Sequence, residues 1–453
     1  MQIAEQSVSN DYFDACTARR EGAPAVAILF PDCFDNWLLE LGVSLTEFSQ
    51  RMMGCWAFSY AQALSSAGVQ TVLFCISVQV SVPVRTVHQP TGAIIYFLPP
   101  SRLYRLFSNR RSNTTPESQS PRIVESILMR TWRYLRRLVA THVDTPLSSL
   151  FEAMKREHCQ VLLVQEYESA RFDLCVLFGR LREVRVFGTF QGGVPNHMLL
   201  RPLRRLSMWF CSGLLIPSTS EAERVMKAYR FPRSKLSLVY SPVDRDIFYA
   251  SSKEEARRSL RIPMSTKIVM YHGAISLEYK GLDVLLEAWN RLSLTLPNED
   301  MRLIVIGTGD DSSRFSHLIS TKKLKGIHWV KHWVQDRELI RRYLCSADVY
   351  VFPSRGDACP NAVIEAMACQ LPIIASEVNG IPDLLQKGAS SCGSLVPPAD
   401  PCAVAEAMEL LLADRSLARE LGQRACIRAR ENFSIEAVGQ QLSHVFLGSQ
   451  QLK

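Results

Sequence analysis

Short apolar segments alternate with amphipathic stretches along the whole chain. In the first half these segments fall at residues 25–30, 69–74, 160–165, 184–187, 213–216 and 236–240, and most are followed by polar, proline- or glycine-containing loops. A second series falls at 267–271, 302–306, 327–330, 349–352 and 372–375. Buried parallel strands separated by helices produce this pattern. We therefore predict an α/β protein with two doubly wound sheets.

Helical spacing of apolar residues fills the intervals between the strands. Helices are predicted at 55–67, 281–293, 336–346, 361–369 and 401–413, with a last helical region at 416–448. Residues 241–248 carry proline and acidic turn chemistry without periodicity, which is typical of a connection between domains. The predicted division is a first domain of residues 1–240, a second domain of 241–430 and a terminal helix within 431–453, with the two domains facing a cleft.

Length and hydropathy support this division. A chain of 453 residues is too long for one hydrophobic core, and its apolar content of 47% is enough to fill two. The first residues contain neither a basic start nor an apolar stretch, and no run of about 18 apolar residues occurs. We therefore expect a cytoplasmic protein.

The thirteen cysteines are scattered without close pairs, and several lie in or beside apolar segments. Reduced thiols that pack in the core are favoured over disulfides or metal ligands. His328 and His332 form the one close histidine pair, and no cysteine or carboxylate cluster stands beside them. No metal site is predicted.

Most of the net charge of +8 comes from one segment, because residues 101–140 hold nine arginines against two glutamates. Within it, residues 122–141 predict a helix with apolar residues on one side and arginines on the other. A solvated surface face is the first interpretation. Contact with an anionic membrane or an acidic acceptor is the second, ahead of nucleic acid, and it would place the protein at the inner face of the membrane.

Two carboxylates, Asp357 and Glu365, stand eight positions apart after the strand predicted at 349–352. Ligands of open α/β sheets bind at the carboxyl ends of the strands. A helix that begins near Pro360 would direct free amides and the positive end of its dipole toward a diphosphate. This arrangement suits a sugar nucleotide, with Glu365 reaching the ribose and Asp357 the hexose.

Several blocks in this half occur in a specific order, at residues 241–248, 272–289, 306–309, 352–355 and 357–372. Through them, residues 236–435 resemble the nucleotide-sugar-binding half of retaining glycosyltransferases of family 4. The resemblance implies a GT-B fold, with two Rossmann-like domains and a terminal helix that returns to the first. It also implies a metal-independent reaction with a nucleotide-diphosphate sugar as co-substrate and no cofactor.

The resemblance implies roles for individual residues. The catalytic residues are Lys280, Asp357 and Glu365, where Lys280 neutralises a phosphate. The donor-binding residues are Gly273, Lys280, Gly307, Gly309, Val334, Ala358, Cys359, Asn361, Ala362 and Glu365. Other interpretations stay open, since Lys280 could be an exposed lysine, the Gly307 to Gly309 segment an ordinary turn and Trp333 a core residue.

Three positions depart from the family pattern. Ala274 stands where an arginine is common, Asp357 replaces the more usual glutamate and Gln370 replaces a common glycine. Loss of the arginine removes a charge-assisted hydrogen bond, worth about 1.5–3 kcal/mol. A catalytically impaired protein that binds nucleotide sugars, or a scaffold, is therefore the alternative to an enzyme. Within enzymes, a nucleotide-sugar hydrolase or a glucan phosphorylase is the rival.

The first domain contributes acceptor-site candidates near strand ends or loops, namely Gly54, Glu166, Gln191 and Gly192. A shaped turn or ordinary polar loop residues would explain the same segments. The predicted function is transfer of a hexose, with retention, from a nucleotide sugar to a saccharide or lipid-linked acceptor in synthesis of cell-envelope polysaccharide or glycolipid.

Overall fold

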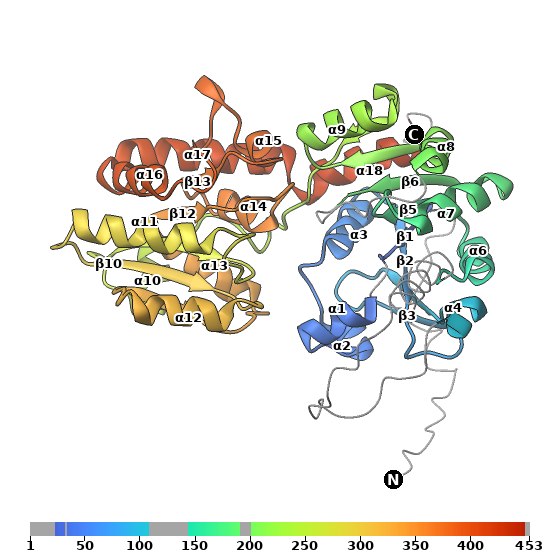
Figure 1. The fold of residues 1–453 in the computed structure, drawn as a ribbon, viewed down its shortest axis with the longest axis horizontal. Coiled ribbons are helices and arrows are strands. Elements are labelled where there is room, and N and C mark those ends of the chain that lie inside the picture. The colour runs from blue at the N-terminus through green and yellow to red at the C-terminus, as the bar shows by residue number, and fades with distance from the viewer. Residues whose placement is uncertain (1–22, 32–33, 108–143, 191–200, 449–453) are drawn as a thin grey trace, which may run out of the picture.

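The computed structural model describes residues 23–31, 34–107, 144–190 and 201–448, and it contains two α/β bodies side by side (Figure 1). One is built on an eight-stranded sheet and the other on a six-stranded sheet. The acceptor candidates Gln191 and Gly192 and the basic segment 122–141 lie outside the described residues. Within the described part, no helix is both long and apolar enough to cross a bilayer.

The first sheet has the strand order β3-β4-β2-β1-β5-β6-β7-β8. Its strands are β1 Ala25–Leu29, β2 Gln70–Ile76, β3 Val84–Val87, β4 Ile94–Leu98, β5 Cys159–Gln165, β6 Arg185–Thr189, β7 Gly213–Ile216 and β8 Leu236–Leu238. All neighbours are parallel except β3 and β4, so the expectation of a wholly parallel sheet is wrong at this edge. β3 was missed because this edge strand is largely exposed and lacks an apolar run.

Helices cover both faces of the first sheet. They are α1 Phe34–Leu41, α2 Leu45–Gln50, α3 Trp56–Ser66, α4 Arg102–Phe107, α6 Leu147–Arg156, α7 Ala170–Leu181, α8 Arg201–Phe210 and α9 Thr219–Tyr229. The helix predicted at 55–67 is α3. Two buried clusters, one on each face, make the strands apolar on both sides.

The second sheet is parallel throughout, in the order β11-β10-β9-β12-β13-β14. Its strands are β9 Lys267–His272, β10 Met301–Ile306, β11 Ile327–Val330, β12 Val349–Phe352, β13 Ile373–Ser376 and β14 Ser394–Val396. Its helices are α10 Lys253–Ser259, α11 Leu282–Thr295, α12 Ser312–Thr321, α13 Arg337–Ser346, α14 Asn361–Ala368, α15 Ile381–Leu385, α16 Pro401–Ala413 and α17 Arg415–Asn432. The five predicted strands lie within one or two residues of β9 to β13.

The terminal helical region is two helices, because Ser434 caps a new one by accepting a hydrogen bond from the amide of Ala437. This helix, α18 Ile435–Leu447, packs with the first domain, and Figure 1 shows it beside α3. The ring of Phe446 lies 5.2 Å from that of Phe187. Gly439 of α18 packs against the carbonyl oxygen of Ala63, because a Cβ at position 439 would lie only 2.0 Å from that oxygen. The core of the first domain therefore includes the end of the chain.

Gly281, the N-cap of α11, brings the two loops of the site together. Its φ is +67°, and a Cβ would lie 1.9 Å from the carbonyl oxygen of Pro353. Only glycine allows this conformation and this approach together. The loop before α11 therefore packs directly on the loop between β12 and α14.

Candidate functional site

A cavity of about 670 Å³ lies between the two domains. The first domain lines it with Phe30, Pro31, Phe34, Asn36, Trp37, Gly54, Cys55, Trp56 and Gln165. The facing wall consists of Ser241, His272, Gly273, Ala274, Lys280, Trp333, Phe352, Asp357, Cys359, Pro360, Asn361 and Ala362. Apart from Ser241 and Trp333, these residues lie at or after the carboxyl ends of β9 and β12, where open sheets bind ligands.

Lys280 and Asp357 form an ion pair on the wall of this cavity. The Nζ atom of Lys280 donates to both carboxylate oxygens of Asp357, at 2.8 and 2.9 Å. The Ser354 hydroxyl donates to Oδ2 of Asp357 at 2.6 Å. Nζ also lies 5.5 Å from the ring centre of Phe352, a cation–π distance. Two of the predicted catalytic residues are thus held together on adjacent loops.

Arg355 braces these loops, and it was not predicted as a site residue. Its guanidinium donates to both carboxylate oxygens of Asp283, at 2.8 and 2.7 Å, and to the carbonyls of Leu277 and Glu278. A bidentate arginine pair fixes geometry better than a point charge does. Arg355 therefore positions the segment that carries Lys280.

Glu365 lies one turn inside α14 and contacts two basic side chains. His272 Nε2 lies 2.9 Å from one carboxylate oxygen, and Arg337 Nη2 lies 3.2 Å from the other. His272 is 6% exposed, and its ring stands edge-on to Tyr350. Both partners come from other elements, β9 and the start of α13, and neither was predicted. Together they fix the orientation of the Glu365 carboxylate.

The start of α14 opens into the cavity. Asn361 and Ala362 line it, and the first amides of a helix have no partner within the helix. Pro360, the N-cap, makes no side-chain capping bond. Beside it, the Cys359 sulfur accepts a hydrogen bond from the amide of Ser241 at 3.3 Å, and burial raises the pKa of this thiol to about 11. The helix end can therefore bind an anion next to a neutral thiol.

A second cavity of about 500 Å³ adjoins the first and shares Gly54, His272, Gly273, Trp333, Asn361 and Ala362 with it. Val334, Arg337 and Glu365 line only the second one. Trp333 is 54% exposed and lines both cavities, so the interpretation of this residue as core packing is wrong.

The glycines and Ala358 occupy different places. Gly273 lines both cavities. The residues that line them do not include Gly307 or Gly309. A Cβ at Gly307 would lie 2.0 Å from the carbonyl of Gly273, and one at Gly309 would lie 2.5 Å from that of Ile275. These two glycines therefore let the loops after β9 and β10 pack together. Ala358 is buried behind the cavity wall, with its carbonyl against Gly380.

On the side of the first domain, Gly54 lines both cavities, with a φ of +85° just before α3. Glu166 has a φ of +62° after β5, while its neighbour Gln165 faces the cavity and accepts a hydrogen bond from the Trp56 indole at 3.0 Å. Trp56 is therefore the residue that the sequence interpretation missed here. Within the described residues no cluster of three or more potential metal ligands occurs.

A family model described as Glycosyl transferases group 1 matches residues 266–414. This region carries Lys280, Asp357, Glu365 and α14. The matched region belongs to that family. The predicted relationship is confirmed at this level, and the narrower assignment to family 4 stays a prediction.

Curated relatives of this group 1 glycosyl transferase region include D-inositol 3-phosphate glycosyltransferase of Corynebacterium diphtheriae, 27% identical over 51% of this chain and 55% of the relative. Alpha-maltose-1-phosphate synthase of Mycolicibacterium smegmatis is 25% identical over 54% of this chain and 65% of the relative. The chain thus matches between about half and two thirds of the length of these relatives.

Solved structures extend the similarity to both domains. Sucrose-phosphate synthase from Thermosynechococcus elongatus superposes with a TM-score of 0.65 at 18% identity, over 93% of this chain and 98% of that one. HepE from Anabaena in complex with UDP and glucose superposes with a TM-score of 0.60 at 12% identity, over 92% and 98%. The predicted GT-B fold is confirmed.

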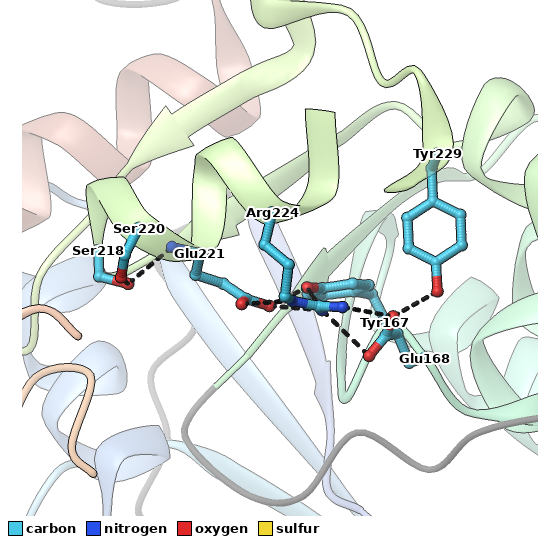
Figure 2. Close-up of polar contacts among 7 residues, drawn as sticks. All are labelled: Tyr167, Glu168, Ser218, Ser220, Glu221, Arg224 and Tyr229. Carbon is cyan, nitrogen blue, oxygen red and sulfur yellow. Dashed lines mark hydrogen bonds and ion pairs between the residues drawn. The ribbon is translucent and has the colours of Figure 1, made fainter. Parts of the chain in front are cut away.

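A buried polar network lies in the first domain, close to its contact with the group 1 domain (Figure 2). Arg224 of α9 lies between Glu168 and Glu221, with ion-pair distances of 3.1 and 2.7 Å. Tyr167 and Tyr229 donate hydroxyls to Glu221 and Glu168. The network joins the loop after β5 to α9.

The start of α9 then contacts the group 1 domain. Both the amide and the hydroxyl of Thr219 donate to the carboxylate of Asp383, at 2.6 and 2.7 Å. Ser218, the N-cap of α9, packs against Gly380. The loop after β5, which follows Gln165 directly, is therefore connected to the second domain through the network and α9.

Proposed function

We propose that the protein is a glycosyltransferase that moves a hexose from a nucleotide-diphosphate sugar to an acceptor hydroxyl. The observation that carries this proposal is the 670 Å³ cavity between the two domains, with the Lys280–Asp357 pair on its wall and the amino end of α14 beside it. Family membership of residues 266–414 supports the reaction class.

In this proposal the diphosphate binds at the amides of Asn361 and Ala362 and at Lys280. Glu365 accepts hydrogen bonds from the ribose hydroxyls, since Arg337 and His272 hold its carboxylate in place. The base enters the second cavity beside Trp333 and Val334. The hexose then lies in the larger cavity near Asp357 and faces the first domain.

The reaction needs charge stabilisation on the departing diphosphate. Lys280 and the helix amides supply it from fixed positions in a partly enclosed cavity, which is the most effective form of electrostatic catalysis. We propose that they do so without a divalent ion. The acceptor attacks on the face from which the diphosphate leaves, a phosphate oxygen takes the acceptor proton, and the anomeric configuration is retained.

The acceptor side carries Trp37, Trp56 and Phe34 together with Asn36 and Gln165. Aromatic faces beside amide groups suit a sugar ring, because the ring presents apolar faces and hydroxyl edges. We therefore propose a saccharide or lipid-linked saccharide acceptor, in line with a role in cell-envelope polysaccharide or glycolipid synthesis.

The experiment is titration calorimetry of the wild type and Glu365→Ala with a panel of nucleotide sugars, beginning with UDP-glucose and run with and without a chelator. We expect one donor to bind the wild type, to lose at least tenfold in affinity in the variant, and to bind equally with chelator. Absence of binding by the wild type across the panel would contradict the proposal.

One observation favours a second candidate, a protein that binds donor without turnover. Lys280 is already neutralised by Asp357, and Ala274 adds no charge to the cavity wall. This candidate predicts donor binding with neither hydrolysis nor transfer. Measurement of UDP release from bound UDP-glucose over a broad acceptor panel distinguishes the two.

A further inference from the structure

Two thiols of the second domain lie next to each other outside the cleft. Cys345 belongs to the last turn of α13, and Cys369 is the C-cap of α14. Each is 5% exposed. The Cys345 thiol donates a hydrogen bond to the carbonyl of Tyr249 at 3.4 Å, and Cys369 is one of its polar neighbours. The proposed transfer reaction uses neither residue.

A separate cavity of about 480 Å³ is lined by both cysteines. It lies at the amino ends of β9 and β12, since Lys267 and Asp348 are on its wall, and it is therefore across the sheet from the donor cavity. Its charged residues are Lys253, Glu254, Arg257, Lys267, Asp348, Arg415 and Arg419. Small solutes thus have a polar route to thiols that the bulk solvent hardly reaches.

The two thiols differ in their surroundings. Hydrogen bonds from Cys369 and Ser251, together with the charge of Arg341, lower the pKa of Cys345 to about 6. Burial raises the pKa of Cys369 well above its ordinary value. On the α10 side, Lys253 and Arg257 are paired with Asp348 at 2.7 and 2.8 Å. Cys345 is thus the nucleophilic thiolate, and Cys369 keeps its proton.

We propose that Cys345 and Cys369 form a peroxide-reactive dithiol that closes to an intramolecular disulfide. The Cys345 thiol first releases its proton to solvent, its thiolate attacks one oxygen of hydrogen peroxide, the O–O bond breaks, and the departing hydroxide takes up that proton and becomes water. The Cys345 sulfenic acid forms in this step. The Cys369 sulfur then attacks the Cys345 sulfur, and the S–O bond breaks.

In this second step the oxygen leaves as water with the Cys369 proton. Overall, two thiols lose two electrons and two protons, and one peroxide is reduced to two waters. The disulfide joins the carboxyl ends of α13 and α14. These same helices carry Arg337 and Glu365 nearer their amino ends.

The experiment is peptide mapping of the full chain. Reduced protein is exposed to hydrogen peroxide, remaining thiols are alkylated, and the protein is cleaved at lysine, arginine and glutamate. Cleavage after Glu365 separates Cys359 from Cys369, so the two products of interest are peptides 343–355 and 366–377. We expect these peptides to be cross-linked, with a mass lower than their sum by two hydrogen atoms and reversed by reductant.

The Cys369→Ala variant tests the order of the steps, since it should trap a sulfenic acid at Cys345 that dimedone labels. The exposed Cys402 supplies the control variant, Cys402→Ala, which should cross-link like the wild type. Full alkylation of both peptides in peroxide-treated wild type would overturn the proposal, as would a link from either cysteine to a third one. The wild-type map decides even if a variant does not fold. The map requires no donor or acceptor, so its result does not depend on whether the proposed transferase activity is correct.

Discussion

The Nζ atom of Lys280 lies 2.8 and 2.9 Å from the two carboxylate oxygens of Asp357, so the cation on the cavity wall carries its own counterion. A diphosphate that enters this site must share Lys280 with Asp357. Each member of the pair therefore neutralises the other, and the lysine lies where a leaving group would need it.

Replacement of Lys280 should reduce turnover more than it reduces the free energy of unfolding. In Lys280→Met the side chain keeps most of its length but cannot donate to a leaving phosphate. We expect kcat/KM with the identified donor to fall by about 100- to 1000-fold. The matched control is Lys322→Met, which removes a surface lysine paired with Glu287 at 2.7 Å, and it should retain full activity. Equal activities of both variants would exclude Lys280 from the reaction.

Glu365→Gln should weaken donor binding while leaving the helix intact. The amide cannot accept as strongly from ribose hydroxyls, and it leaves Arg337 without an anion. Charge-assisted hydrogen bonds are worth about 1.5–3 kcal/mol, so we expect a Kd for UDP that is about 10- to 100-fold higher by calorimetry. Glu406→Gln on the exposed side of α16 is the control. An unchanged Kd in Glu365→Gln would place the ribose elsewhere.

Ala274→Arg tests whether the cavity lacks a cation. Ala274 lines the larger cavity and is exposed, so an arginine there has room to reach a diphosphate. One new charge-assisted bond should tighten donor binding about tenfold. Ala274→Met, of similar length without charge, separates charge from packing. If both variants bind donor as the wild type does, the cations already present suffice.

His88 should make the first domain sensitive to acid. Its ring is fully buried, lies 3.7 Å from the ring of Phe58, donates from Nε2 to the carbonyl of Met52 at 2.8 Å and lies 2.7 Å from Thr91 Oγ1. Burial lowers the pKa of His88 from 6.5 to about 4. Between these values the unfolded chain binds a proton that the folded chain does not.

The contribution of neutral His88 to the free energy of unfolding should therefore be fully present above pH 6.5. It should decrease as the pH falls toward about 4, by up to about 1.4 kcal/mol per pH unit. Urea unfolding at several pH values, for the wild type and His88→Gln, measures it. The variant should be less stable at neutral pH, with a shallower loss in acid. Parallel pH profiles for the two proteins would contradict the assignment to His88.

Arg224→Met should destabilise the first domain. The substitution leaves the buried carboxylate of Glu168 and the carboxylate of Glu221 without their cation, and an unpaired buried charge costs about 1–3 kcal/mol or more. We expect a lower urea midpoint than in Arg233→Met, which removes an exposed arginine near the same surface. Equal midpoints would mean that the ion pairs of Arg224 contribute nothing to the stability of the first domain.

Strands were predictable here because parallel strands that are buried on both faces consist of contiguous apolar residues. The predicted strands at β7 and β12 match the observed bounds residue for residue. The antiparallel edge strand β3 has no such run and was missed, and its neighbour β4 was also missed although its residues are apolar and buried. The order of motifs also placed Lys280, Asp357 and Glu365, since each follows a strand that could be recognised.

The partners of these residues could not be found in the same way. His272 and Glu365 are 93 positions apart, and Trp56 and Gln165 are 109 positions apart, so no local pattern connects them. Gly307 and Gly309 show the opposite problem. The sequence interpretation assigned these two glycines to ligand binding. In the structure they lack a side chain because the backbone of the loop after β9 packs directly against them.

The chain passes between the domains twice, and the two passages touch. Val243 on the outward passage forms a β-bridge with Ser434 on the return, and its amide donates to the carbonyl of Phe433 at 2.7 Å. The two bodies are therefore joined at this bridge as well as through Thr219 and Asp383. A movement that widened the cavity between them would have to accommodate both connections, so the width of the cavity depends on contacts far from its own lining.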